Sequence, residues 1–300
     1  MDQPEIPLPG EARHHSQLNQ STNSYRQIAD LADLVEKIFA SASVRIHPAS
    51  QLAFLISSIK NLADAWDTDD LDNLPEDTLP NLCNSFRIFQ AIRKLENQAN
   101  IQTHLSKLLK GSLDFSTRNP SVAKDFLFEI ETFSLLHIKG LNPQFLEPDI
   151  IIKSKNQPIS IACKKIYSHK RLQSSLSKAV AQINKSGNQG IAVINIDDLL
   201  PVDSFIRATD ALSAQARLDN ENVVFLNKHE HHFRKYLESS RILACIISTS
   251  TVVHLPNTSP SLNIFNQQTL WTVPGISPAR QQLLDSLYEK FTTTSESAST

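Results

Sequence analysis

The stretch EPDIIIKSKNQPISIACKKI, residues 147–166, decides how the second half of this chain is expected to fold. Two runs rich in β-branched residues, EPDIIIK and ISIACKKI, flank the polar turn KNQP, and this pattern predicts a β-hairpin. Successive side chains of a strand point to opposite faces of a sheet, so the second strand has an apolar face and a face that reaches a lysine. The apolar face is Ile159, Ile161 and Cys163 and is expected in the core, whereas the other face is Ser160, Ala162 and Lys164 and is expected to be exposed.

The hairpin predicts which side chains meet across the two strands. Pairing outward from the turn places Lys153 opposite Pro158 and Asp149 near Ala162. Asp149 and Lys164 are then expected on one face of the sheet, within reach of one phosphate-sized group.

The segments around the hairpin predict the fold class. A helix is expected over residues 121–138, after Pro120 and before Gly140. The amphipathic segment HKRLQSSLSKAVAQINKSG, closed by Gly187, predicts a second helix, and GIAVINI predicts a buried strand. The order helix, hairpin, helix, strand contains a βαβ crossover, whose last strand should lie parallel to ISIACKK. We therefore expect an α/β domain whose sheet contains the antiparallel hairpin and a last strand parallel to ISIACKK.

The chain divides into four expected regions. Apolar residues at spacings of three and four predict helices in the part of the chain before Gly111, whereas both ends of the chain lack such periodicity. These regions are a disordered arm at 1–24, an all-helical region at 25–110, the α/β domain at 111–291 and a disordered tail at 292–300.

Composition sets limits on the class of protein. The chain has 300 residues, a net charge of −2 and 40% apolar residues, which is ordinary for a globular protein. The three cysteines are far apart and odd in number, which argues against a disulfide framework. No apolar run is long enough for a membrane span, and the first residues do not resemble a signal peptide. We therefore expect a cytoplasmic protein with no membrane partner.

An acid and a lysine that converge on a strand have a specific chemical use. Asp149 could hold Mg²⁺ or Mn²⁺, and such an ion polarises a phosphoryl oxygen and lowers the pKa of a bound water. Lys164 could orient that water or offset charge in the transition state. One carboxylate holds a metal poorly, so we expect Glu129, on the helix before the hairpin, to supply a second ligand.

These residues resemble the PD-(D/E)xK nuclease superfamily. The resemblance rests on FE at 128–129, PD at 148–149, ACK at 162–164 and Gln182, and it covers about residues 115–200. It implies a restriction-endonuclease-like fold, with a mixed sheet flanked by helices, and Mg²⁺-dependent cleavage of a phosphodiester. The implied roles are metal ligands at Asp149, Glu129 and the backbone carbonyl of Cys163, a catalytic lysine at Lys164, and a glutamine, Gln182, that positions water or phosphate.

One position departs from the superfamily pattern. The central acid should stand two residues before the lysine, and Ala162 occupies that place. Three explanations remain open. Glu129 or Glu131 has taken over the role of the acid, the site is inactive and the fold is kept for binding, or Ala162 is an inactivating replacement.

A block of basic residues lies around the lysine. Between Asp149 and Asp197 the sequence has no acid and eight lysines or arginines, which is the pattern expected of a surface that meets a phosphate backbone. The expected contacts with nucleic acid are Lys165, Arg171 and Lys178, the last two sharing a polar helical stripe with Gln182. The alternatives are a solvated strand end for Lys165 and a solvated basic face balanced by the acidic loop at 64–77.

The sequence therefore predicts a Mg²⁺-dependent nuclease that acts on DNA. The alternative is a catalytically inactive nuclease-fold module that binds nucleic acid or a protein. In either case the helical region at 25–110 could form a homodimer or bind a protein partner.

Overall fold

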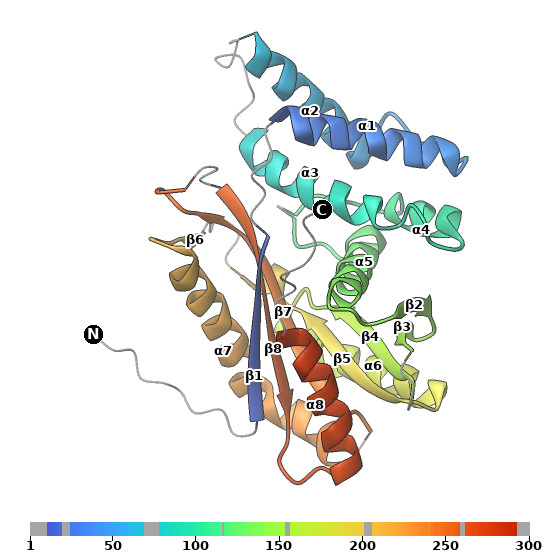
Figure 1. Cartoon of the computed structure of the whole chain (residues 1–300), viewed down its shortest axis with the longest axis vertical. Coiled ribbons are helices and arrows are strands. Elements are labelled where there is room, and N and C mark those ends of the chain that lie inside the picture. The colour runs from blue at the N-terminus through green and yellow to red at the C-terminus, as the bar shows by residue number, and fades with distance from the viewer. Residues whose placement is uncertain are drawn as a thin grey trace.

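The computed structural model describes residues 11–19, 25–68, 78–115, 117–153, 157–200, 206–239, 241–258 and 262–292. These residues form an α/β fold, with one mixed sheet between helices and a further group of helices stacked on it (Figure 1). The helices are α1 (Tyr25–Ser41), α2 (Gln51–Asp67), α3 (Thr78–Arg93), α4 (Ile101–Leu108), α5 (Val122–Ile138), α6 (Leu172–Ser186), α7 (Ala211–Glu238) and α8 (Pro278–Thr292), with short 3₁₀ turns η1 (His169–Arg171) and η2 (Asp197–Leu199). The strands are β1 (Glu11–Asn19), β2 (Pro143–Leu146), β3 (Asp149–Ile152), β4 (Ile159–Lys165), β5 (Gln189–Asn195), β6 (Ile206–Arg207), β7 (Ala244–His254) and β8 (Leu262–Thr272).

The strand order confirms the predicted mixed sheet. Across the described chain, the sheet runs β1-β8-β7-β5-β4-β3-β2, and β6 pairs with β7. The hairpin strands β3 and β4 are antiparallel, whereas β4, β5 and β7 are mutually parallel. The helix α6 joins β4 to β5, so the predicted βαβ crossover is present. It ends, as predicted, at Gly187, whose φ of 73° is the left-handed conformation that favours glycine at a helix end.

The register of the hairpin is the predicted one. Ile150 lies opposite Ile161, and Ile152 lies opposite Ile159. Continued by one residue at its start, the same register sets Asp149 against Ala162. The turn residues 154–156 lie outside the described residues.

Helices cover both faces of the central strands (Figure 1). The cluster of α5 and α8 packs on the face that carries Ile161 and Cys163, and the cluster of α6 and α7 packs on the face that carries Ala162. Ser160 and Ala162 both have an exposed fraction of 0%. The expectation that this second face is open was therefore wrong, because the crossover helix lies directly over it.

The helical N-terminal region is joined to the sheet domain by a continuous core. One cluster of buried side chains combines residues of α1 to α4 with Ala123, Phe126, Leu127 and Ile130 of α5. The opposite side of α5, including Phe128 and Phe133, packs on the sheet. The predicted boundary between residues 110 and 111 therefore does not separate two cores, since α5 belongs to both.

Four strands, β1, β2, β6 and β8, were not predicted. Residues 11–19, expected to belong to a disordered arm, form β1 and pair with β8. β2 pairs with β3, and β8 returns antiparallel to β7. Residues 1–10, 20–24 and 293–300, which include the rest of the predicted arm and almost all of the tail, lie outside the described residues.

Candidate active site

Asp149 and Lys164 are in direct contact. Lys164 Nζ lies 3.1 Å from Asp149 Oδ2, although the two residues come from different strands. The Asp149 side chain is 11% exposed and the Lys164 side chain 20%. The central geometric prediction of the sequence, a carboxylate and an ammonium that meet over the hairpin, is therefore confirmed.

The backbone of Cys163 explains how this pair is held. The Cys163 N–H donates to Asp149 Oδ2 at 2.7 Å, and Lys164 Nζ donates to the Cys163 carbonyl at 2.7 Å. The backbone N–H and C=O of Cys163 both point toward β3. Because β3 begins at Asp149, it has no residue opposite Cys163 to pair with these two groups. The carboxylate and the ammonium replace that missing partner, and the pair therefore also caps the end of the β3–β4 ladder.

Glu129 of α5 provides a second carboxylate near this pair. It is partly buried, and burial together with the negative charge of Asp149 raises its pKa to about 8, although Lys107 and Lys164 oppose the rise. Burial also raises the pKa of Asp149, against the opposing effects of Lys164 and of the Cys163 N–H. Because its pKa is raised to about 8, the Glu129 carboxyl holds a proton at neutral pH, and a bound cation would replace that proton.

The donor set fits Mg²⁺ in part. Mg²⁺ keeps several water ligands and commonly takes only one or two protein carboxylates, which Asp149 and Glu129 could supply. The Cys163 carbonyl, the third predicted ligand, accepts a hydrogen bond from Lys164 instead. Within the described ranges no group of three or more His, Cys, Asp or Glu side chains could hold a metal. A metal here would therefore rely mainly on water.

Ala162 shows why a third acid is missing. Its side chain is fully buried in a cluster with Leu172, Leu176 and Ala179 of the crossover helix α6. A carboxylate at this position would enter an apolar contact between β4 and α6, where a charge without a partner is costly.

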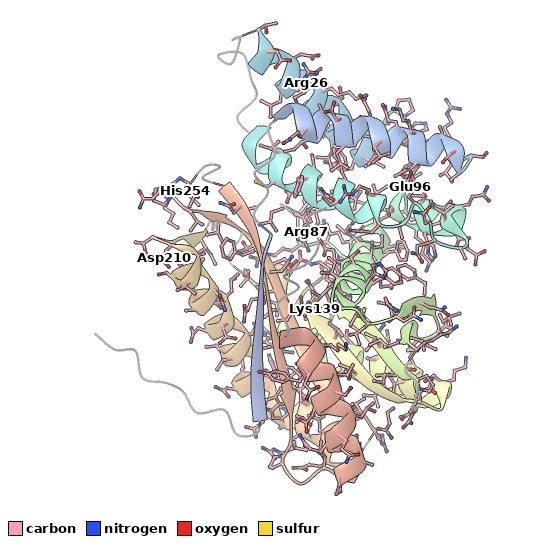
Figure 2. The ribbon with its side chains drawn as sticks, in the orientation of Figure 1. Arg26, Arg87, Glu96, Lys139, Asp210 and His254 are labelled. Atoms are coloured by element: carbon pink, nitrogen blue, oxygen red, sulfur yellow. The ribbon has the colours of Figure 1, made fainter. Side chains whose placement is uncertain are left out.

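Glu131 does not take over the role of the acid. Arg87 of α3 binds it through two hydrogen bonds, one of them from Nη2 to Oε2 at 2.7 Å. The same guanidinium lies 3.1 Å from Asp197, just beyond β5. Figure 2 labels Arg87 where the helical region faces the sheet. Of the two helix acids considered, only Glu129 lies near Asp149.

Lys165 is buried and does not face solvent. Its side chain is 2% exposed, and its ammonium lies 2.6 Å from Asp198 and 2.7 Å from Asn195 Oδ1. The prediction that Lys165 binds nucleic acid was wrong, as was the alternative of a solvated strand end. The reason is that β5 runs parallel to β4, so the acids that follow β5 meet the lysine that ends β4.

The crossover helix is placed as predicted, but it does not complete the site. Its buried stripe is Leu172, Leu176, Ala179, Val180 and Ile183, as expected. Arg171 and Lys178 are exposed, and their role in binding nucleic acid remains a prediction. Gln182 is partly buried, its Oε1 has no hydrogen-bond partner, and no contact joins it to Asp149 or Lys164 in the described part of the chain.

Lys107, whose charge acts on Glu129, was not predicted from the sequence. It belongs to α4 of the helical region, far from the hairpin in sequence, and no motif marked it. The signal that could have found it is the packing of α4 on α5, which is a tertiary contact and has no local sequence pattern.

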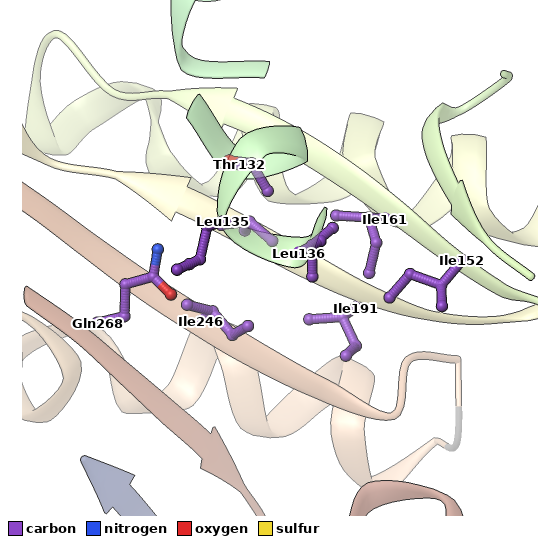
Figure 3. Close-up of a pocket in the computed structure, with 9 residues that line it drawn as sticks. Thr132, Leu135, Leu136, Ile152, Ile161, Ile191, Ile246 and Gln268 are labelled. Carbon is purple, nitrogen blue, oxygen red and sulfur yellow. The ribbon is translucent and has the colours of Figure 1, made fainter. Parts of the chain in front are cut away.

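The cavity beside the sheet is too small to bind a substrate. It lies between α5 and the strands, lined by side chains such as Leu135, Ile161 and Ile246 (Figure 3). Its volume is about 10 Å³, which holds about one water molecule. A second cavity, of about 290 Å³, lies between the start of α2 and the end of α4, away from Asp149.

Among the described residues, no helix has the length and apolar character needed to cross a bilayer.

Comparisons with known proteins add no assignment. No family model, curated protein or solved structure matched the chain.

Proposed function

We propose that this protein is a Mg²⁺-dependent nuclease of restriction-endonuclease-like type that hydrolyses phosphodiester bonds, with DNA as its substrate. The observation that carries the proposal is the contact of Asp149 with Lys164 beside the perturbed carboxyl group of Glu129. A carboxyl group with a strongly raised pKa beside a carboxylate–lysine pair is typical of catalytic sites. The resemblance to the PD-(D/E)xK superfamily gives this arrangement its chemical interpretation.

The roles follow from the chemistry of each side chain. Asp149 Oδ1 and the Glu129 carboxylate would hold the metal, since Asp149 Oδ2 already accepts two hydrogen bonds. When bound, the metal would polarise the phosphoryl group and acidify a water ligand. Lys164 would donate a hydrogen bond to a phosphoryl oxygen or to the attacking water, and its charge would stabilise the charge that develops on the phosphate.

Cleavage of a supercoiled plasmid tests this proposal. The wild-type protein should convert plasmid to nicked or linear forms in Mg²⁺ and not in EDTA. Asp149→Ala and Lys164→Ala should abolish this conversion. Lys153→Ala is the matched control, because Lys153 is an exposed lysine that directly follows β3, the strand of Asp149, and should be dispensable. Equal cleavage by all four proteins would point to a contaminating nuclease and reject the assignment.

A second function is favoured by a separate observation. The Cys163 carbonyl is occupied by Lys164, and Ala162 leaves the site one acid short, as in a module that has lost catalysis. Such a module would bind DNA with an affinity that falls steeply with salt, and it would not cut in Mg²⁺ or Mn²⁺. A protein scaffold would show neither behaviour.

A further inference from the structure

Lys107 is a cation that the helical region brings toward the candidate site. It lies in the last turn of α4, and its ammonium is 4.6 Å from the centre of the Phe126 ring. Phe126 and Glu129 stand three residues apart on α5, a spacing that makes them neighbours on one helix face. Lys107 therefore lies near the face of α5 that carries Glu129, and its charge acts on the Glu129 carboxyl.

An aromatic cluster fixes this approach. The ring of His104 stacks on Phe126 at 5.4 Å and lies 4.7 Å from Phe145, which belongs to β2. Phe145 is paired with Ile150, the residue after Asp149. Burial, together with the charge of Lys107, lowers the pKa of His104. The rings thus connect α4, α5 and β2 close to Glu129 and Asp149. The contact with Phe126 holds Lys107 at the edge of this aromatic cluster.

The charge of Lys107 is not neutralised by a close partner. No carboxylate lies within salt-bridge distance of its ammonium in the part of the chain that the structure describes, and its side chain is partly buried. Its electrostatic effect falls on Glu129, where it opposes the rise in pKa. A partly buried ammonium held by a ring face is suited to an anion that arrives from outside the protein.

We propose that Lys107 binds a backbone phosphate of the nucleic-acid substrate. This inference rests on the proposed function and gives the helical region a direct part in it. Lys164 lies beside Asp149 and Lys107 acts on Glu129, so one strand of nucleic acid would cross the two carboxylates with a phosphate at each lysine. The helical region contributes to the substrate site and is not only a separate partner surface.

The salt dependence of DNA binding tests Lys107. Affinity of the full-length protein for a labelled DNA duplex is measured by fluorescence anisotropy at several salt concentrations, without Mg²⁺ so that no cleavage occurs. Lys107→Gln should reduce the slope of log affinity against log salt by about 0.9, the value for one lost phosphate contact. Lys107→Arg, which keeps the charge, should restore the slope. Lys37→Gln is the matched control, since Lys37 is exposed on α1, away from the site.

The outcomes separate this inference from the proposed function. Wild-type binding with an unchanged slope in Lys107→Gln would overturn the role of Lys107 and leave the nuclease assignment standing. No binding by the wild-type protein would reject both. An equal loss in Lys107→Gln and Lys37→Gln would indicate a diffuse basic surface and would also overturn the inference. Thermal unfolding of each variant checks that the fold is kept.

Discussion

Metal binding at this site should release a proton from Glu129. Its pKa, raised from about 4.5 to about 8 by burial and by Asp149, leaves the carboxyl about nine-tenths protonated at pH 7. A metal must displace that proton in order to bind. The apparent affinity for Mg²⁺ should therefore rise by about tenfold per pH unit well below pH 8 and level off above it, which is about 25-fold between pH 6.0 and pH 7.5.

Calorimetry measures both parts of this prediction. Titration of Mg²⁺ in two buffers with different ionisation enthalpies gives the number of protons released, which should be about one at pH 7. Glu129→Gln has no proton to lose, so it should bind Mg²⁺ weakly and without the steep pH dependence. Affinity that does not change between pH 6.0 and pH 7.5 would contradict proton release from Glu129, as would an unchanged pH dependence in Glu129→Gln.

Three further predictions concern stability, each measured by urea denaturation. The pKa of Glu129 is higher in the folded protein than in the unfolded chain, so the wild-type protein loses stability as pH rises from about 4.5 through 8. Glu129→Gln should therefore be more stable than wild type by roughly 3–5 kcal/mol at pH 8.5 and equal to it at pH 4. Equal stability of the two proteins at both pH values would contradict the raised pKa. Ala162→Asp should lose roughly 2–4 kcal/mol, because it buries a charge beneath α6; a neutral effect would show that the position is open. Lys165→Met should lose roughly 3–5 kcal/mol by leaving Asp198 buried without its partner, whereas the exposed Lys153→Met should be neutral.

The parts of the fold that the sequence predicted are those with a strong local pattern. The β-branched runs around the polar turn predicted the hairpin and its register, and the apolar spacing in residues 172–183 predicted the face of α6 that is buried. β1 was missed because EARHHSQLN has no strand pattern, and its pairing with β8 is a long-range contact. The burial of Ala162 was missed for the same reason, since it depends on where α6 lies.

The site was predicted only in its centre. Asp149 and Lys164 were found because both lie on the hairpin, where alternation and register fix their positions. Lys165 was misassigned because its partner, Asp198, is brought to it by the parallel pairing of β4 and β5. Lys107 was missed because its approach depends on helix packing. Local patterns therefore identified the pair, and tertiary contacts determined what surrounds it.

The rate of Mg²⁺-dependent phosphodiester cleavage by wild type and by Lys164→Ala, measured side by side on one DNA duplex, tests the central claim most directly. We expect cleavage by the wild-type protein and a rate at least about 100-fold lower in the variant, the usual cost of removing a group that stabilises charge in a transition state. A wild-type protein that binds Mg²⁺ and DNA but does not cleave would contradict it, as would a variant that cleaves at the wild-type rate.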